Sequence, residues 1–254
     1  MKFLPDAAFS ALAISCMLLS ATALAEEYLP NRIKGDMGGA IYGSTSPVRG
    51  SSAAPIAVPY FYFDYGRFFS RFDTFGIKTL PLGYGYLEIV GRINLDGYKT
   101  NNSILRGINE RKNSLPLGIG TFQETPIGGF FLNAYYDANP SHGRLYEVLY
   151  AAELHAGNSV VYPMLGFEHF SAQYTRYFYG VSPTEAASSI YPVYTPAATT
   201  TPKLGMVWEV PVANDWNASL YMLRKWPGPA ISNSPLLSQK IQDVAFISLS
   251  YRYK

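Results

Sequence analysis

Apolar and polar residues alternate along several stretches of about ten residues each. Residues 87–96 show this most clearly, with apolar side chains such as Leu87 and Ile89 at odd positions and mostly polar side chains at even positions. Residues 144–155 and 245–253 repeat the pattern. Because side chains of a β-strand point alternately to opposite faces, it predicts strands with one apolar and one polar face. About ten residues also suffice for a tilted strand to cross a bilayer, with lipid on one side and a polar lumen on the other.

Less regular apolar runs complete a set of ten expected strands. The other seven are residues 54–65, 68–77, 115–122, 127–136, 160–172, 204–212 and 216–224. The first of them contains Pro55 and Pro59, which cannot donate to a ladder, so we expect it to begin at a sheet edge or to be irregular. Residues 34–42 would be an eleventh strand, lying outside the wall unless one more strand is present. The sequence therefore predicts an all-β, antiparallel barrel of about ten strands, with twelve as the alternative.

The connections between these strands alternate in length. Residues 226–240 and 175–203 are long, whereas residues 213–215 and 156–158 are short. Short turns at one end and long loops at the other are typical of outer-membrane barrels. In the longest loop, Ser182-Pro183-Thr184-Glu185 has a capping residue, a proline at the first helical position and a glutamate three residues after the cap. This order predicts a short helix in that outer loop.

Composition favours a lipid-facing surface. The chain has 21 Tyr and 15 Phe, and 15% of its residues are charged, compared with about 25% in ordinary globular proteins. No stretch reaches the roughly 20 apolar residues of a spanning helix. Such a chain either hides its surface in a large assembly or faces lipid as a closed barrel. A formal net charge of +2 argues against a nucleic-acid partner, which would require a clustered basic face.

The N-terminus has the layout of a secretory signal peptide. Lys2 precedes an apolar run at residues 7–19, and Ala23-Leu24-Ala25 forms a small-x-small cleavage site. We therefore expect residues 1–25 to be a signal peptide and residues 26–254 to be the outer-membrane barrel domain. The competing interpretations are a membrane anchor, for which the apolar run is too short, and a lipoprotein cleavage box at residues 13–16, which end at Cys16. Cys16 is the only cysteine, so the exported chain would hold no disulfide.

The residues offer little chemistry. The three histidines lack the close spacing of a zinc site, and the glycine pairs at residues 83–85 and 118–120 lack the rest of a dinucleotide fingerprint. Ser171 and His169 lie near an expected strand end, but no G-x-S-x-G motif accompanies them. We expect no catalytic, metal or cofactor site. The chain is accordingly interpreted as non-enzymatic.

Polar residues of the expected strands are assigned to the lumen. Narrow barrels fill their interior with side chains, and buried charges there must pair. We therefore expect a structural rather than a solute-binding role for four lumen residues: Glu88, Arg92, Glu147 and Glu153. The aromatic clusters at residues 60–63 and 174–179 are interpreted as lipid-interface girdles rather than ligand-stacking platforms. The same alternation directs Val90 into the lumen and Ile89 toward lipid, so a charge placed at Val90 should be better tolerated than one at Ile89.

Residues 178–186, read as Phe-Tyr-Gly-Val-Ser-Pro-Thr-Glu-Ala, resemble the Y-Y-G-V-[ST]-x-x-E-A signature of the MipA/OmpV family. Tyr42-Gly43-Ser44, residues 232–236 and residues 250–253 support the resemblance. Two departures are the missing aspartate at residues 227–230, where many members have G-D-A, and Lys254 after the usual terminal aromatic residue.

The resemblance implies an outer-membrane barrel in contact with outer-membrane lipid in a Gram-negative cell. The best-known member of the family is a scaffold that joins a lytic transglycosylase to a murein-synthesising penicillin-binding protein. By analogy, the chain would be a non-enzymatic scaffold for peptidoglycan enzymes, with its N-terminal segment, residues 26–36, as the main periplasmic surface beyond short turns. The alternative function is a narrow channel or solute-uptake barrel.

Overall fold

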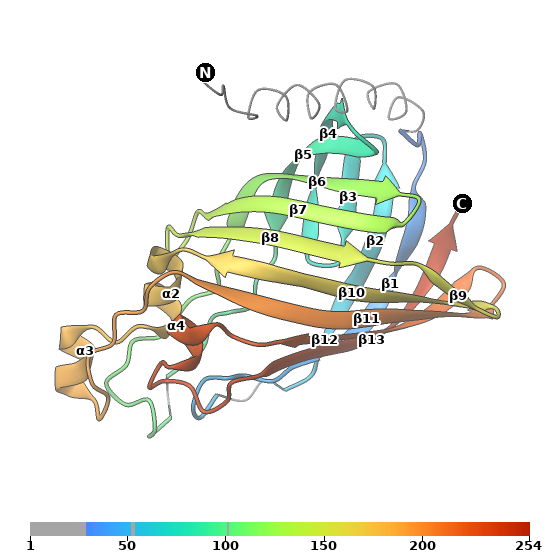
Figure 1. Ribbon diagram of the computed structural model, residues 1–254. Coiled ribbons are helices and arrows are strands. Elements are labelled where there is room, and N and C mark those ends of the chain that lie inside the picture. The colour runs from blue at the N-terminus through green and yellow to red at the C-terminus, as the bar shows by residue number, and fades with distance from the viewer. Residues whose placement is uncertain (1–28, 52–53, 101) are drawn as a thin grey trace, which may run out of the picture.

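The computed structural model describes residues 29–51, 54–100 and 102–254. The expected signal peptide, residues 1–25, lies outside the described residues. Twelve antiparallel strands form a closed barrel, and β9 extends one hairpin (Figure 1). The wall consists of β1 (Lys34–Ser44), β2 (Ile56–Tyr65), β3 (Phe68–Arg71), β4 (Thr74–Leu82), β5 (Gly85–Arg92), β6 (Pro116–Thr125), β7 (Gly128–Asp137), β8 (Arg144–Ala151), β10 (Ser159–Phe170), β11 (Thr199–Ala213), β12 (Trp216–Lys225) and β13 (Gln242–Tyr253), with β9 at Leu154–Ala156. Pairing of β13 with β1 closes the ring.

The strand count of ten is wrong, and the alternative of twelve is confirmed. The expected strand at residues 68–77 is two short strands, β3 and β4, joined by a turn at Phe72 and Asp73. Phe72 reverses the chain by adopting a left-handed φ of 55°, which is uncommon for a bulky residue and therefore hard to foresee. Residues 34–42 are not outside the wall, because β1 pairs with both β2 and β13.

Alternation along the strands separates the two faces of the wall as predicted. In β5, Ile89 is 57% exposed and points outward, whereas Glu88 and Val90 are each 2% exposed and point into the lumen. In β13, Ile247 and Leu249 are exposed while Phe246 is buried. The odd positions of both strands therefore form the apolar outer surface.

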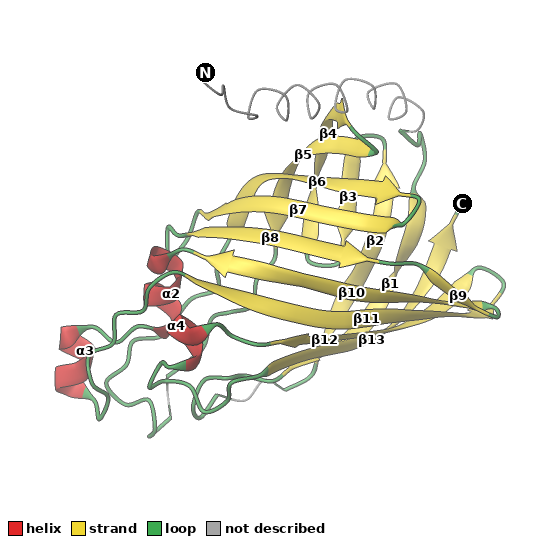
Figure 2. Cartoon of the chain, in the orientation of Figure 1, coloured by secondary structure: helices red, strands yellow, loops and turns green. Residues whose placement is uncertain are grey.

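The two ends of the barrel differ. One end, called the turn end here, has short connections at residues 66–67, 83–84, 126–127, 157–158 and 214–215. The other, called the loop end, carries the long connections and the helices α2 (Ala172–Tyr179), α3 (Pro183–Ser188) and α4 (Pro229–Ser232), gathered on one side of the strands (Figure 2). The predicted short helix is confirmed as α3, whose Ser182 and Glu185 form a complete capping box. No helix among the described residues is long and apolar enough to cross a membrane.

The long connections pack on one another to form what we call the loop cap, made of residues 93–100, 102–115, 171–198 and 226–241. Its interior is apolar, and Tyr174, Phe178, Leu105 and Leu236 are each fully buried there. The girdle interpretation of residues 174–179 is therefore wrong, because these rings form a small core over the mouth of the barrel. The alternation within residues 60–63 splits that cluster too: Phe61 is exposed on the outer face, while Tyr60 is buried in the lumen.

Candidate functional site

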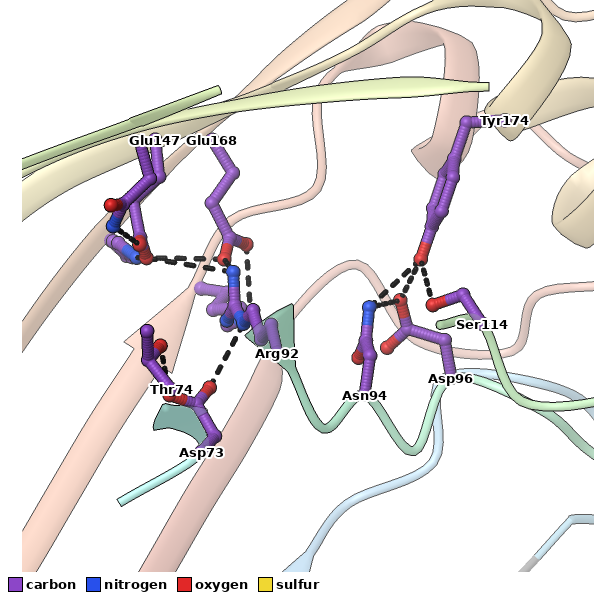
Figure 3. A network of polar contacts seen from close by, with 12 residues as sticks. Asp73, Thr74, Arg92, Asn94, Asp96, Ser114, Glu147, Glu168 and Tyr174 are labelled. Carbon is purple, nitrogen blue, oxygen red and sulfur yellow. Dashed lines mark hydrogen bonds and ion pairs between the residues drawn. The ribbon is translucent and has the colours of Figure 1, made fainter. Parts of the chain in front are cut away.

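The lumen is crossed by a set of charges, mostly buried, centred on Arg92, the last residue of β5. Its guanidinium lies 2.8 Å from Glu168 of β10, 2.9 Å from Asp73 of the β3–β4 turn and 3.5 Å from Glu147 of β8 (Figure 3). Two lysines from the opposite wall complete the set. Lys225 of β12 lies 2.9 Å from Glu168, and Lys203 of β11 contacts both glutamates.

We call these six residues the ion network: Asp73, Arg92, Glu147, Glu168, Lys203 and Lys225. Three cations face three carboxylates, so their formal charges cancel. Glu168 and Lys203 are among the most buried charged residues of the chain. A buried ion is costly unless it is paired and hydrogen-bonded, and each member here has at least one partner of opposite sign. Because the members come from five strands and one turn, the ion network also ties facing parts of the wall together.

A second polar cluster lies within the loop cap and joins α2 to the β5–β6 connection. The Tyr174 hydroxyl of α2 donates to Asp96 at 2.5 Å and accepts from the Asn94 amide at 2.9 Å, with Ser114 at 3.3 Å (Figure 3). Burial raises the pKa of Tyr174 well above its ordinary value, as does the neighbouring Asp96 carboxylate. The ring therefore stays a neutral hydrogen-bond donor, and it fixes the segment after β5 beneath the cap.

A small cavity lies between this cluster and the ion network. Its volume of about 20 Å³ is room for roughly one water molecule. It is lined by Asn94, Asp96, Glu168, Phe170, Tyr179, Thr201, Lys225, Pro227, Ile231 and Gln242. A space of this size can hydrate the charged groups around it, but it is far smaller than a typical ligand pocket.

Aromatic rings fill another part of the lumen. Phe72, at the β3–β4 turn, has ring centroids of Tyr60, Tyr62, Tyr221 and Phe246 within 5.0–5.7 Å. We call these five residues the aromatic cluster. The left-handed backbone of Phe72 directs its side chain toward β2 and toward β12 and β13, which lie on the other side of β1. The β3–β4 hairpin therefore helps to pack the interior.

Further ion pairs occupy the remaining lumen positions. Arg252 of β13 pairs with Asp36 of β1 at 2.7 Å and with Glu209 of β11 at 2.6 Å. Arg71 of β3 pairs with Glu88 of β5 at 3.1 Å. These pairs, like the ion network, join neighbouring or facing strands and leave few unpaired charges.

The predicted lumen residues are placed as follows. Glu88, Arg92 and Glu147 do point inward and are paired, which confirms their facing. Glu153 keeps the lumen parity, because β8 and β9 share one register along β10, but at the turn end its side chain is 52% exposed and lies 3.6 Å from His155.

Sequence reasoning missed several charged members of the ion network. Glu168 lay in a predicted strand and has the lumen parity of Met164 and Phe170, so parity alone could have found it. Lys203 was assigned to a loop because threonines and a proline precede it, yet β11 begins at Thr199. Asp73 lay inside a predicted strand and is a turn residue instead.

Ser171 and His169 are not brought together for catalysis. The Ser171 hydroxyl caps α2 by accepting from the Tyr174 amide, and it also accepts from the Arg144 amide. His169 lies on the outer face of β10, where its Nδ1 is 2.9 Å from the Thr200 hydroxyl. Within the residues that the structure describes, no three His, Cys, Asp or Glu side chains gather as metal ligands.

The glycine pairs also have structural places. Gly83 lies in the β4–β5 turn with a φ of +59°, which favours glycine. A Cβ on Gly118 would lie 1.9 Å from the Ala134 carbonyl oxygen, so β6 approaches β7 too closely for a side chain there.

The family signature lies at the centre of the loop cap. Glu185 accepts hydrogen bonds from the Ser182 amide at 2.9 Å and the Asn109 amide at 3.0 Å, and it pairs with Arg111 at 2.8 Å. One glutamate thus holds α3 to the β5–β6 loop. The sequence model of the family described as MltA-interacting protein MipA matches residues 37–253, from β1 to the last residue of β13. The chain belongs to the MipA family.

Membership confirms the resemblance seen in residues 178–186. A search among curated proteins found none that matches the chain significantly. The MipA family and the barrel fold are together consistent with an outer-membrane protein. In this family member, the signature residues Ser182 and Glu185 have an evident structural role, because they organise the cap that covers the lumen.

Proposed function

We propose that this MipA-family chain is a non-enzymatic outer-membrane barrel that acts as a docking scaffold for enzymes of murein synthesis and turnover. The family description names an interaction with MltA, a partner of that member, and we extend such a role to this chain. We place the loop cap at the cell exterior and the turn end in the periplasm, because outer-membrane barrels have long outer loops and short periplasmic turns.

The observation that carries the proposal is the filled interior. The loop cap, the ion network and the aromatic cluster each occupy the lumen with buried side chains. A channel or uptake barrel would require a polar path between these layers. A barrel without such a path acts through its surfaces, and the surface available to periplasmic enzymes is the turn end.

The hairpin of β9 and β10 is the strongest candidate for the docking surface. β8 pairs with β7 only as far as Ala151, so Leu154–Ala156 pairs with β10 alone and extends past the neighbouring strand. β9 lies at the end opposite the helices (Figure 1). The N-terminal segment offers less than expected, because Asp36 is a buried residue of β1.

Blocking this hairpin tests the proposal. The chain after Cys16 has no cysteine, so Asn158→Cys can be coupled to a bulky maleimide polymer at the β9–β10 turn. Ile127→Cys places the same polymer on the β6–β7 turn at the same end. After cross-linking of whole envelopes, capture should retain a murein transglycosylase or synthase with the Ile127 conjugate and lose it with the Asn158 conjugate.

Two results would count against the scaffold. Retention of no murein enzyme by the unmodified protein contradicts the function itself. Equal retention by both conjugates leaves the scaffold standing but places its contact elsewhere than β9–β10.

A further inference from the structure

A group of side chains gathers on the outer face of the wall at the loop end of β7, β8 and β10. We call it the outer cluster, made of Tyr136, His142, Arg144, Tyr146 and His169. The rings of Tyr136 and His142 are stacked with centroids 6.2 Å apart, and those of Tyr146 and His169 have the same separation. Arg144 pairs with Tyr136 across β7 and β8. It is also a diagonal neighbour of His169, at about 7–8 Å, so one small ligand can reach both side chains.

The hydrogen-bond donors of the outer cluster are largely unused. The Arg144 backbone bonds to Ser171, and His169 directs Nδ1 at the Thr200 hydroxyl. Among the residues that the structure describes, however, neither the Arg144 guanidinium nor the Nε2 atom of His169 has a hydrogen-bond or ion-pair partner. The outer cluster therefore presents an uncompensated positive charge and free donors on the outside of the barrel.

The neighbouring strands place no carboxylate on this surface to balance Arg144. The acidic residues of β7, β8, β10 and β11 point inward: Asp137, Glu147, Glu168 and Glu209. Arg224 is the contrast, because it points outward from the loop end of β12 and Asp243 of β13 accepts two hydrogen bonds from it, at 2.7 and 2.9 Å. Of these two outward arginines, one is neutralised by the protein itself and Arg144 is not.

The loop cap adds to the positive charge at this end of the barrel. Within its described residues, the exposed charged side chains are mostly cations: Lys99, Arg106, Lys112, Arg176 and Lys240 against Glu110. Charges of one sign gathered on a surface attract ligands of the opposite sign, an effect that salt screens over roughly 10 Å. An anionic group near the loop end is therefore attracted before it makes any direct contact.

The outer cluster lies at the height expected of a membrane interface. Toward the turn end, outward side chains of the same strands are apolar and exposed, such as Leu132, Leu165 and Phe167. Toward the loop end, Arg144 adjoins the start of α2, because its amide donates to the Ser171 hydroxyl. Exposed tyrosines between an apolar band and the loops are typical of the headgroup region. With the loop cap outside the cell, this is the headgroup level of the outer leaflet.

We propose that the outer cluster binds a phosphate group of an anionic lipid in the outer leaflet, with Arg144 as the charged partner and the imidazoles of His142 and His169 as further donors. The planar guanidinium matches the geometry of a phosphate and can donate two parallel hydrogen bonds to it. No carboxylate of the neighbouring strands competes for Arg144. This inference rests on the membrane location in the proposed function and does not require a scaffold role.

Binding of lipid A to the folded protein in detergent micelles tests the proposal. Lipid A carries phosphates on an acylated disaccharide, and its dephosphorylated form keeps the same acyl chains, so the pair isolates the contribution of the phosphate. Native mass spectrometry counts the bound lipid at each lipid concentration. The wild type should bind lipid A about tenfold more tightly than the dephosphorylated form, the ratio expected of hydrogen bonds to a charged group.

Matched arginine variants locate the site. Arg144→Gln removes the unpaired guanidinium and should abolish the preference for the phosphorylated lipid. Arg224→Gln removes one positive charge from the same outer surface, but this charge is already paired with Asp243, so the preference should remain. His169→Phe keeps a ring beside Tyr146 but has no Nε2, and it should reduce the preference by a smaller factor than Arg144→Gln does. Heat-dependent migration on gels confirms that each variant is folded.

Four results would overturn the proposal. A wild type that does not fold as a heat-modifiable barrel contradicts the membrane location itself. Equal binding of both lipid forms by the folded wild type removes the phosphate site but leaves the scaffold role untouched. Equal losses in Arg144→Gln and Arg224→Gln mean that the surface attracts anions by its overall charge alone. Displacement of lipid A by an equal concentration of inorganic phosphate means that the ligand is a free anion rather than a lipid.

Discussion

Arg92 lies at the loop-end terminus of β5 with three carboxylates within 3.5 Å, and its side chain is almost fully buried. Removing one member of such a set leaves the others buried and unpaired, which typically costs more than the pair itself contributes. The stability of the barrel should therefore depend more on equal numbers of positive and negative charges in the ion network than on any single contact. Substitutions that change this number can test the dependence.

Arg92→Leu should destabilise the barrel by about 3–5 kcal/mol, because Asp73, Glu147 and Glu168 would then face only two lysines. Arg224→Leu removes an exposed partner of Asp243 and should destabilise the barrel far less than Arg92→Leu does. Urea titration of folding into lipid vesicles measures both. The double variant Arg92→Leu, Glu168→Leu should recover part of the loss, and no recovery would show that the charges are not coupled.

The lowered pKa of Glu185 predicts that the stability of the loop cap depends on pH. Burial raises its pKa, but the amides of Ser182 and Asn109 and the Arg111 guanidinium outweigh burial and lower the pKa from 4.5 to about 2. A depressed folded pKa means that the stabilisation is present above pH 4.5 and is lost as the pH falls toward 2. The protection of the α3 amides from hydrogen exchange, relative to the intrinsic rate at each pH, should therefore fall over this range.

Glu185→Gln is the matched variant for this prediction. It keeps the shape of the side chain but does not titrate, so the protection of the α3 amides from exchange should be lower at neutral pH and nearly independent of pH down to about 2. If the wild-type exchange rates show no acid dependence beyond that of the variant, the Glu185 contacts do not hold the cap.

At the scale of elements, the strands were readable from the sequence where one face is lipid and the other is polar. β5, β8 and β13 were found with the correct facing, because alternation reports two different solvents. The β3–β4 hairpin was not readable, because Asp73 is the only usual residue in its two-residue turn and the bulky Phe72 before it fits one longer strand. What holds that turn is the aromatic cluster, whose rings come from residues 60 to 246 and are not neighbours in the sequence.

Phe72 allows packing and backbone strain to be separated. Phe72→Ala removes the ring and should cost about 3–5 kcal/mol. Phe72→Gly removes one carbon more, yet glycine adopts a φ of 55° without the steric cost of a Cβ, so it should be about 1 kcal/mol more stable than the alanine variant. Urea midpoints in vesicles rank the two, and an alanine variant as stable as the glycine variant would mean that the turn relaxes.

The structure of β5 allows substitutions on its lipid-facing side and on its lumen-facing side to be compared. Ile89→Arg should cost roughly 2–4 kcal/mol if Ile89 lies near the bilayer midplane. The expectation that Val90→Arg is tolerated no longer follows, because Val90 is buried in a packed interior, where a larger side chain typically costs about 1–3 kcal/mol. Val90→Thr, similar in size, should be the mildest change. Folding yields in vesicles would contradict this facing if Ile89→Arg were the mildest.

For the whole molecule, the sequence predicted a closed barrel with paired charges in its lumen. It left open whether the lumen is filled, and it could not predict which charges meet. Parity places Arg92 and Glu147 in the lumen, but their partners Glu168, Lys203 and Lys225 depend on how the ring closes and how the strands are staggered. The loop cap was equally hidden, because aromatic residues in a loop look the same whether they face a membrane interface or one another. Both unknowns are long-range contacts, which local patterns do not encode.

The layered interior predicts that the chain does not conduct, even when the loop cap is opened. Leu105 and Leu236 are fully buried in the cap, so Leu105→Asp with Leu236→Asp should expose the mouth by placing charges in its apolar core. The ion network and the aromatic cluster lie beneath and do not depend on these leucines. In planar bilayers, neither the wild type nor the double variant should give single-channel steps, whereas faster proteolysis of residues 171–198 should report the opened cap. Steps from the wild type would contradict the filled lumen and favour the uptake function, and steps from the double variant alone would make the cap the only barrier.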